Sequence, residues 1–324
     1  MENLNLKKEV ESNIDISVIS AVYNEEANLN KFIEKLTTSL QTFTNNYEII
    51  FVLDPSKDKS EEIIIEESKK NSKIKLIKLS RRFGQPASTI CGIQNSRGKC
   101  CVTIDSDLQD PPELIEKLYK KYKEEDLDVV FTRRINREGE SFVKKIISKI
   151  GYKAIKKLSD LDIPEDVGDF RLISEKIITK LKVIDEPQVY LRGLIAYIGF
   201  KQGLVDYERQ KRFAGHGKYN RFFGSIRIGL DGLLGFSSKP IYIMSSFGFL
   251  LAMFSFLLGI WYFIQKIIGI DLTPGLPTNV LLITFFAGIQ LLALGLIGEY
   301  IGRIYDQVKK RPVYIIDKKI NFDD

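Results

Sequence analysis

The sequence has few of the residues that build thiol and imidazole sites. Three cysteines and one histidine occur among 324 residues. The cysteines, at positions 91, 100 and 101, lack the spacing of a zinc site, so we expect them to be buried apolar side chains of a reduced, cytosolic domain. The histidine, His216, lies in a basic, glycine-containing loop and is assigned no role.

Other absences narrow the class of protein. Neither Gly-x-Gly-x-x-Gly nor Gly-x-x-x-x-Gly-Lys-Ser occurs, so the dinucleotide-binding and P-loop fingerprints do not apply. The first residues contain no apolar signal core, and we expect no cleaved secretory peptide. A net charge of +6 does not by itself indicate a nucleic-acid partner, and none is expected.

Long uncharged runs are absent before residue 235 and present after it. Residues 241–265 carry no charge, and 25 helical residues would extend roughly 37 Å, enough to cross a bilayer core. A second uncharged run covers residues 280–298. Basic residues flank this pair of runs, whereas the connecting loop has little charge. The positive-inside rule therefore predicts a transmembrane hairpin, with spans at about 241–266 and 279–299 and both termini in the cytoplasm.

The first part of the chain alternates between strand and helix patterns, which predicts an α/β fold with a mostly parallel sheet. Asn24 and Ser60 are expected to cap the helices that follow them. The predicted strands are residues 16–22, 47–53, 74–79, 101–104, 127–131 and 205–208.

An acidic stretch, Asp105-Ser-Asp-Leu-Gln-Asp-Pro-Pro112, joins the fourth predicted strand to a helix. Ligands of open α/β sheets bind at this edge. Asp105 and Asp107 are two residues apart, so in an extended chain both side chains point to one side. Paired carboxylates are typical ligands of a hard divalent cation such as Mg²⁺. The alternative is an acidic turn that caps the following helix.

Polar residues also follow the other strands at this edge. They include Glu25, Asp54 and Gln85, although Asp54 taken alone reads as a turn residue. Arg133 and Arg134 follow the fifth predicted strand and are placed to clamp phosphate. Residues 166–171, Asp-Val-Gly-Asp-Phe-Arg, form an active-site candidate in which Gly168 would allow a tight turn. An ion-paired turn without catalytic function is the alternative.

Basic segments separate the α/β part from the predicted spans. The lysines of residues 142–158 are interpreted as a solvated helix face. Residues 221–234 form an apolar segment that includes Arg221 and Arg227, which suits a helix lying in the membrane interface, or else a core helix. The predicted domains are residues 1–212 (cytosolic α/β domain), 213–239 (basic loop and juxtamembrane amphipathic helix), 240–302 (two transmembrane helices) and 303–324 (cytosolic basic tail).

Several motifs, in order, resemble the polyprenyl-phosphate glycosyltransferases of glycosyltransferase family 2, which include the bactoprenol glucosyltransferase and dolichyl-phosphate mannose synthase relatives. The resemblance covers nearly the whole chain, and the acidic motif with its Gln and two Pro is specific to this branch. The motifs are Val-Tyr-Asn-Glu-Glu (22–26), Leu-Ser-Arg-Arg-Phe-Gly (79–84), the acidic stretch continued to Glu113, Gly-Asp-Phe-Arg (168–171) and Gly-Glu-Tyr-Ile-Gly-Arg (298–303).

The resemblance implies a GT-A fold and an inverting transfer of sugar from a nucleotide-diphospho-sugar, expected to be a UDP-sugar, to undecaprenyl phosphate at the inner membrane. The product would serve cell-envelope glycan or lipid modification. It also implies a homo-oligomer, with a tetramer suspected. The implied residues are Asp105, Asp107 and Gln109 for Mg²⁺ or Mn²⁺; Asp169 and Asp107 for catalysis; Ala21, Tyr23, Glu25, Asp54, Gln85 and Asp105 for the nucleotide-sugar; and Arg133, Arg134, Arg171, Arg212 and Lys218 for phosphates.

The chain departs from the family pattern at two places. The usual Val-Asp-Asp-Gly-Ser is Val-Leu-Asp-Pro-Ser at residues 52–56, and the usual Pro before Val-Tyr-Asn is Ala21. Because of these departures, the sequence does not identify the nucleotide base or the sugar of the donor. One alternative is a processive polysaccharide synthase, but its usual Gln-x-x-Arg-Trp motif is missing, because the single tryptophan, Trp261, lies in a predicted span. A second alternative is a non-catalytic membrane scaffold. A third is a nucleotidyltransferase, which would not explain the hairpin.

Overall fold

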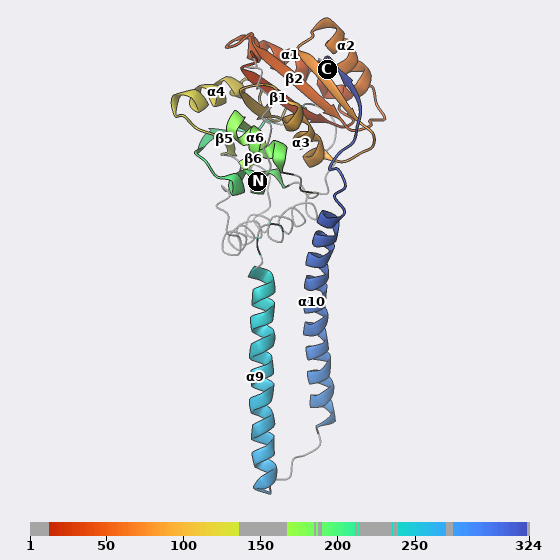
Figure 1. Cartoon of the computed structure of the whole chain (residues 1–324), viewed down its shortest axis with the longest axis vertical. Helices are drawn as coiled ribbons and strands as arrows, with labels where there is room; N and C mark the ends of the chain where they lie inside the picture. Colours follow the sequence, from red (N-terminus) through yellow and green to blue (C-terminus); the bar gives the residue numbers. More distant parts are fainter. Residues whose placement is uncertain are drawn as a thin grey trace, which may run out of the picture.

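The computed structural model describes residues 13–135, 167–184, 186, 190–210, 213, 235, 237, 239–269 and 275–322. Figure 1 shows the sheet of its α/β domain with the helices around it. The sheet has eight strands in the order β7-β5-β6-β4-β1-β2-β3-β8. The strands are β1 Ile16–Val22, β2 Tyr47–Leu53, β3 Ile74–Leu79, β4 Cys100–Thr103, β5 Val129–Arg134, β6 Val167–Ser174, β7 Gln202–Tyr207 and β8 Ile316–Ile320.

The strands of the amino-terminal part are parallel, as the sequence predicts. β1 pairs in parallel with β2 and with β4, and β2 pairs in parallel with β3. The chain thus leaves β1 toward β2 and β3, and then crosses to the other side of β1 to form β4. This reversal is the topological switch point where open α/β sheets bind ligands, and the acidic stretch begins directly after it.

Helices cover both faces of the sheet because each contributes an apolar stripe to a separate core. Helices α1, α2 and α4 pack on one face, and α3, α6 and α7 pack on the other. In α1, Leu29, Phe32 and Leu36 recur at helical spacing and are fully buried. The helices are α1 Glu26–Gln41, α2 Ser60–Lys70, α3 Gln85–Asn95, α4 Leu114–Glu124, α6 Glu175–Val183, α7 Leu191–Ile198, α9 Lys239–Ile267 and α10 Leu276–Val308.

Three local predictions are wrong. Glu25, not Asn24, is the cap residue of α1, and Asn24 instead has a positive φ of 51° and accepts a hydrogen bond from the Lys57 backbone. Ser60 is the first residue of α2, and its hydroxyl accepts a hydrogen bond from the Glu25 backbone. Gly168 lies within β6 and not in a tight turn. Strand β6 is antiparallel to both neighbours, so it breaks the parallel pattern.

Two long helices extend from the α/β domain as an antiparallel pair (Figure 1). They are α9 and α10, and they contain the two predicted spans. Among the described residues, one stretch, Phe285–Val308, is long and apolar enough to cross a membrane. The sequence prediction that α9 is a second span stays a prediction.

The carboxyl-terminal segment belongs to the sheet. β8 pairs antiparallel with β3, and the Ser80 backbone donates a hydrogen bond to the carbonyl of Ile315. Tyr314 donates a hydrogen bond from its hydroxyl to Gln94 on α3 at 2.7 Å, and Asn321 donates to the carbonyls of Ser68 and Ile74. The prediction of a separate tail after residue 303 therefore needs correction, because its end completes the sheet.

Candidate active site

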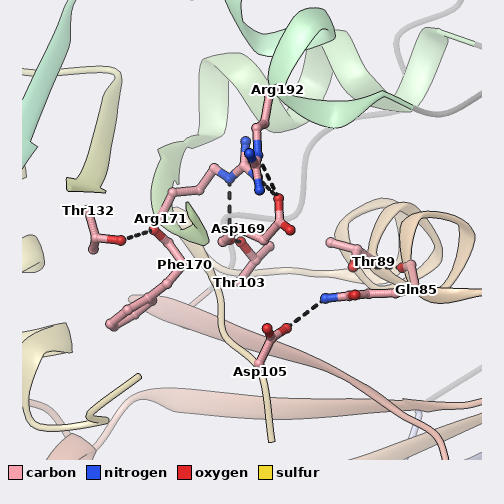
Figure 2. Close-up of polar contacts among 9 residues, drawn as sticks. All are labelled: Gln85, Thr89, Thr103, Asp105, Thr132, Asp169, Phe170, Arg171 and Arg192. Carbon is pink, nitrogen blue, oxygen red and sulfur yellow. Dashed lines mark hydrogen bonds and ion pairs between the residues drawn. The ribbon is translucent and has the colours of Figure 1, made fainter. Parts of the chain in front are cut away.

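The acidic stretch after β4 is held by its own backbone and by a neighbouring helix. The Gln109 N–H donates to Oδ1 of Asp107 at 3.1 Å, and Leu108 takes a positive φ of 59°. The Gln85 side chain, at the start of α3, donates to Oδ1 of Asp105 at 2.7 Å (Figure 2). The structure thus brings together Gln85 and Asp105, two of the residues predicted to contact the nucleotide-sugar.

The carboxylates of the acidic stretch lie close enough together to repel one another. Burial, together with the carboxylates of Asp110, Asp169 and Asp107, raises the pKa of Asp105 to about 8. Such crowding favours a bound cation, since a divalent ion beside these oxygens would stabilise the ionised form.

The chemistry of the donor set fits a hard divalent cation. Asp105 and Asp107 supply carboxylate oxygens, and Gln109 adds an amide two residues later. Across the described ranges, no three carboxylate, imidazole or thiol side chains are arranged as a metal site. Two carboxylates are enough for Mg²⁺, which typically binds one or two protein carboxylates and fills its other coordination positions with water and substrate phosphates.

Asp110 has a different role from the helix cap considered in the sequence. It is buried, with 1% exposure, and accepts a short hydrogen bond from the hydroxyl of Tyr207 at the end of β7. Arg134 donates to the same hydroxyl at 3.2 Å, and Arg209 lies 3.6 Å from the Asp110 carboxylate. Burial and Asp110 raise the pKa of Tyr207 to about 12, so the phenol stays protonated and can donate.

Arg133 and Arg134 have different partners in the structure, and the prediction that both bind phosphate stays a prediction. Neighbouring residues of a strand point to opposite faces. Arg134 points toward Tyr207 and Asp110, whereas Arg133 makes a two-pronged ion pair with Asp206, at 2.7 and 2.9 Å. Gly168 leaves room for Arg134: a Cβ there would lie 3.1 Å from its guanidinium.

Asp169 lies on β6 beside two arginines (Figure 2). Its Oδ1 accepts hydrogen bonds from Nη2 of Arg171 at 2.7 Å and from Nε of Arg192 at 3.1 Å. Burial acts to raise the pKa of Asp169, but the guanidinium groups of Arg192 and Arg171 outweigh it and hold the pKa well below its ordinary value. Asp169 is therefore a permanent anion, paired on one oxygen.

Arg171 is fully buried, which argues against its predicted contact with a substrate phosphate. Burial lowers its pKa to about 10, with Asp169 opposing that shift and Arg192 adding to it. Its Nη1 is buried without a hydrogen-bond partner in the part of the chain that the structure describes. The side chain lies behind Asp169 and orients it.

The residues predicted to line the nucleotide pocket lie at the ends of β1 and β2. Ala21 and Tyr23 are half-buried, and the guanidinium of Arg82 stacks 4.1 Å from the centre of the Tyr23 ring. Glu25 accepts a hydrogen bond from the side chain of Asn28 at 2.7 Å. These positions share the edge of the sheet that carries the acidic stretch, as predicted.

Asp54 is tied to the loop between β3 and α3. Its two oxygens accept hydrogen bonds from the backbone N–H groups of Phe83 and Gly84, at 3.1 and 2.9 Å. Gly84 has a φ of 91°, a conformation that favours glycine. Asp54 thus fixes the loop, which agrees with its interpretation as a turn residue.

Sequence reasoning missed Arg192, Tyr207 and Arg209 as members of the site. Each lies far along the chain from its partner: Tyr207 is 97 residues from Asp110, and Arg192 is 23 residues from Asp169. Their only signal in the sequence is a polar residue at a strand or helix end. Arg212 and Lys218, predicted to bind phosphate, lie outside the described residues.

Two groups of opposite charge thus lie at one edge of the sheet. The acidic cluster, Asp105, Asp107 and Asp110, suits a cation and the phosphates that the cation carries. The basic cluster, Arg171 and Arg192 around Asp169, suits an anion. Such a site can bring two phosphate-bearing molecules together although they repel each other.

Comparisons with known proteins agree with this chemistry. Residues 17–182, just over half of the 324 residues, match the family described as "Glycosyl transferase family 2". The uncharacterized glycosyltransferase YkcC of Bacillus subtilis is 38% identical over 310 residues, covering 96% of this chain and 95% of that protein. The bactoprenol glucosyl transferase of Shigella phage SfII is 33% identical over 303 residues, covering 94% and 97%.

A solved structure shows the same fold. The glucosyl-3-phosphoglycerate synthase of Mycobacterium tuberculosis, in complex with phosphoglyceric acid, aligns with a TM-score of 0.50 and 16% identity. The alignment covers 69% of this chain and 81% of that one. The α/β domain therefore has the GT-A fold, as predicted.

Proposed function

The chain belongs to glycosyltransferase family 2, and from this premise we propose that it transfers a sugar from a nucleotide-diphospho-sugar to polyprenyl phosphate. The observation that carries the proposal is the extent of similarity: a relative named bactoprenol glucosyl transferase matches over 94% of this chain and 97% of its own length. A UDP-sugar is the expected donor and undecaprenyl phosphate the expected acceptor.

The long helices support a membrane location for the acceptor. Phe285–Val308 has the length and composition of a span, and we propose that α9 forms a second one. The α/β domain and both termini would then lie at the cytoplasmic face of the inner membrane, since basic residues flank the hairpin. A homo-oligomer, a tetramer by family resemblance, stays a prediction.

In the proposed reaction, an oxygen of the lipid phosphate attacks the anomeric carbon of the sugar. The bond from that carbon to the nucleoside diphosphate breaks, the diphosphate takes the electron pair, and the anomeric configuration inverts. A phosphate monoester has a second pKa of about 6, so the attacking oxygen is already largely ionised near neutral pH. A strong general base is therefore unnecessary, and Asp169 is proposed to position the acceptor.

Asp105 and Asp107, with Gln109, would hold Mg²⁺ or Mn²⁺. The ion would neutralise the charge that grows on the leaving diphosphate. Gln85 orients Asp105 through its hydrogen bond at 2.7 Å, and Gln109 donates its backbone N–H to Asp107, so both carboxylates are positioned before substrate arrives. Ala21, Tyr23 and Glu25 are proposed to line the nucleotide pocket.

The test is transfer of radiolabelled sugar from a panel of UDP- and GDP-sugars to a short-chain polyprenyl phosphate. Metal-dependent label in the organic phase, abolished by EDTA, is expected from one donor and would name the sugar. Growth of a water-soluble polymer would instead support a processive synthase. Absence of both transfer and nucleotide-sugar binding, with the protein folded in detergent, would overturn the proposal in favour of a scaffold.

A further inference from the structure

The turn that carries the acidic stretch has a backbone conformation that its surroundings must hold. Leu108, between Asp107 and Gln109, has a φ of 59° although it is not a glycine. Residues with a side chain rarely adopt this conformation, and it persists only where other contacts support it. One contact lies within the turn, where the Gln109 N–H donates to Asp107 at 3.1 Å. Further contacts come from the segment that follows β7.

This segment runs from Tyr207 to Phe213 and is called the crossing segment; its residues 207–210 and 213 are described. It begins at the end of β7, the first strand in the order of the sheet, and Phe213 reaches α1, where Nζ of Lys31 lies 3.8 Å from the centre of its ring. Between these two points the Tyr207 hydroxyl donates to Asp110. The crossing segment therefore passes along the edge of the sheet that carries the acidic stretch.

Gln210 of the crossing segment bonds to Gln109 through both of its backbone groups. The Gln210 N–H donates to the carbonyl of Gln109 at 3.0 Å, and Nε2 of the Gln109 side chain donates to the carbonyl of Gln210 at 3.4 Å. A carbonyl oxygen only accepts hydrogen bonds, so the amide of Gln109 turns its nitrogen toward Gln210. The amide oxygen, which is the atom that a hard cation takes, is thereby turned away from Gln210.

We propose that Gln210 is a positioning residue for the divalent cation and acts through its backbone N–H and carbonyl on Gln109. The inference rests on the proposed function and deepens it, because it assigns part of the cation site to a residue 101 positions from Gln109. The nitrogen and oxygen of a side-chain amide have nearly the same shape, so an unheld amide can present either one. The contact with Gln210 selects the orientation that suits a cation.

The experiment measures the affinity of the full chain in detergent for Mn²⁺ alone, from the electron paramagnetic resonance signal of the free ion. Gln210→Pro removes the N–H, and we expect about tenfold weaker binding, as for other groups that orient a metal ligand. Gln210→Ala is the matched variant: it keeps both backbone groups and should bind within about twofold of wild type. Asp105→Asn should abolish binding, which identifies the ion counted as the one at the acidic stretch.

Gln210→Gly extends the test to a variant that keeps both backbone groups but loosens the chain. Its affinity for Mn²⁺ should be about two- to fivefold below that of Gln210→Ala. Thermal unfolding checks each variant, and Gln210→Gly takes the place of Gln210→Pro if the latter does not fold.

A double variant distinguishes positioning from general damage to the turn. Because Gln210 is proposed to act through the amide of Gln109, its effect should disappear when that amide is removed. Gln109→Ala combined with Gln210→Pro should therefore bind Mn²⁺ no more weakly than Gln109→Ala alone. Additive losses would overturn the proposal. So would Gln210→Pro with wild-type affinity, or Gln210→Ala that loses as much affinity as Gln210→Pro.

Mn²⁺ binding is measured without sugar transfer, so failure of this inference and failure of the proposed function are distinguishable. If the variants bind Mn²⁺ as expected but wild type transfers no sugar from any donor, the inference holds and the proposed function fails. If wild type transfers sugar to polyprenyl phosphate but binds no Mn²⁺, the proposed transfer holds and this inference fails.

Discussion

Asp105 and Asp169 lie at the same edge of one sheet, yet their surroundings are opposite. Burial and three neighbouring carboxylates raise the pKa of Asp105 to about 8, whereas two arginines outweigh burial and hold the pKa of Asp169 well below its usual range. One residue type thus serves two different purposes. Titratable neighbours whose pKa values are pushed apart mark a division of labour in an active site. We propose that the division separates a cation-binding half, around Asp105, from an anion-binding half, around Asp169.

The largest effect is expected from removing charge in the acidic cluster. Asp105→Asn keeps the shape and the hydrogen-bond acceptor for Gln85 but removes the negative charge, so we expect sugar transfer to fall by about 10³-fold. The assay is metal-dependent transfer to polyprenyl phosphate. The control is Asp126→Asn, since Asp126 is an exposed aspartate whose side chain is 90% accessible. Asp105→Asn with more than about a tenth of wild-type activity would contradict the assignment of this half to the cation.

The next effect should come from the anion-binding half. Asp169→Asn removes the anion that orients Arg192, and we expect kcat to fall by about 10²-fold while the KM for the donor changes little. Steady-state kinetics with each substrate varied in turn will separate the two constants. Equal loss of turnover and of donor binding would show that Asp169 serves the donor, and the comparison between the halves would fail.

The same two substitutions should change metal-free stability in opposite directions. Asp169→Asn leaves two arginines without their counter-charge and should lower the free energy of unfolding by about 1–3 kcal/mol. This loss is smaller than for a fully buried ion pair, because Asp169 is partly exposed and solvent screens its charge. Asp105→Asn removes a repelled carboxylate and should stabilise it.

The stabilisation expected from Asp105→Asn should depend on pH, because Asp105 titrates at a different pH in the folded and unfolded protein. The folded protein binds the Asp105 proton more tightly than the unfolded chain does, so wild type loses stability as the pH rises from about 4 to about 8. The advantage of Asp105→Asn should therefore grow across that range. Urea unfolding in EDTA at several pH values measures this. A difference that stays constant with pH would show that Asp105 is not protonated in the folded protein.

The smallest effect is expected at the link between the acidic cluster and β7. Tyr207→Phe removes the hydroxyl that donates to Asp110 and accepts from Arg134, at a cost of about 1–2 kcal/mol and a few-fold loss of activity. Urea unfolding and the transfer assay measure the two quantities. The control is Tyr197→Phe, since Tyr197 is 67% exposed. Equal behaviour of the two variants would mean that Tyr207 does not support the site.

The sequence predicts most of the sheet and the acidic half of the site. The sequence locates β1, β2 and β3 because each is a short, mostly buried run rich in apolar and β-branched residues, and Asp105 follows closely after β4. The anion-binding half was only partly predicted. Asp169 and Arg171 lie in a motif, but Arg192 joins them from a helix in a different part of the chain, and only packing brings it there.

Two differences between the expected and the observed surroundings of residues have a shared physical cause. Gly168 was expected in a turn, since glycine is frequent there, but its value lies in the space that it leaves for Arg134. Arg133 and Arg134 were expected to act together, but strand geometry points them to opposite faces. In both cases the function of a residue depends on a partner strand that local sequence does not specify. β8 was missed for the same reason: its Asp-Lys-Lys centre reads as a strand only when paired with β3.

β8 also constrains how the protein is made. Translation must pass α9 and α10 before the strand that closes the edge at β3 exists. Until then the edge has unpaired backbone groups, which can pair with another chain. A fragment that ends before α9 would keep that open edge permanently and would be prone to aggregate. Completion of the α/β domain is thereby delayed until the long hairpin has been synthesised.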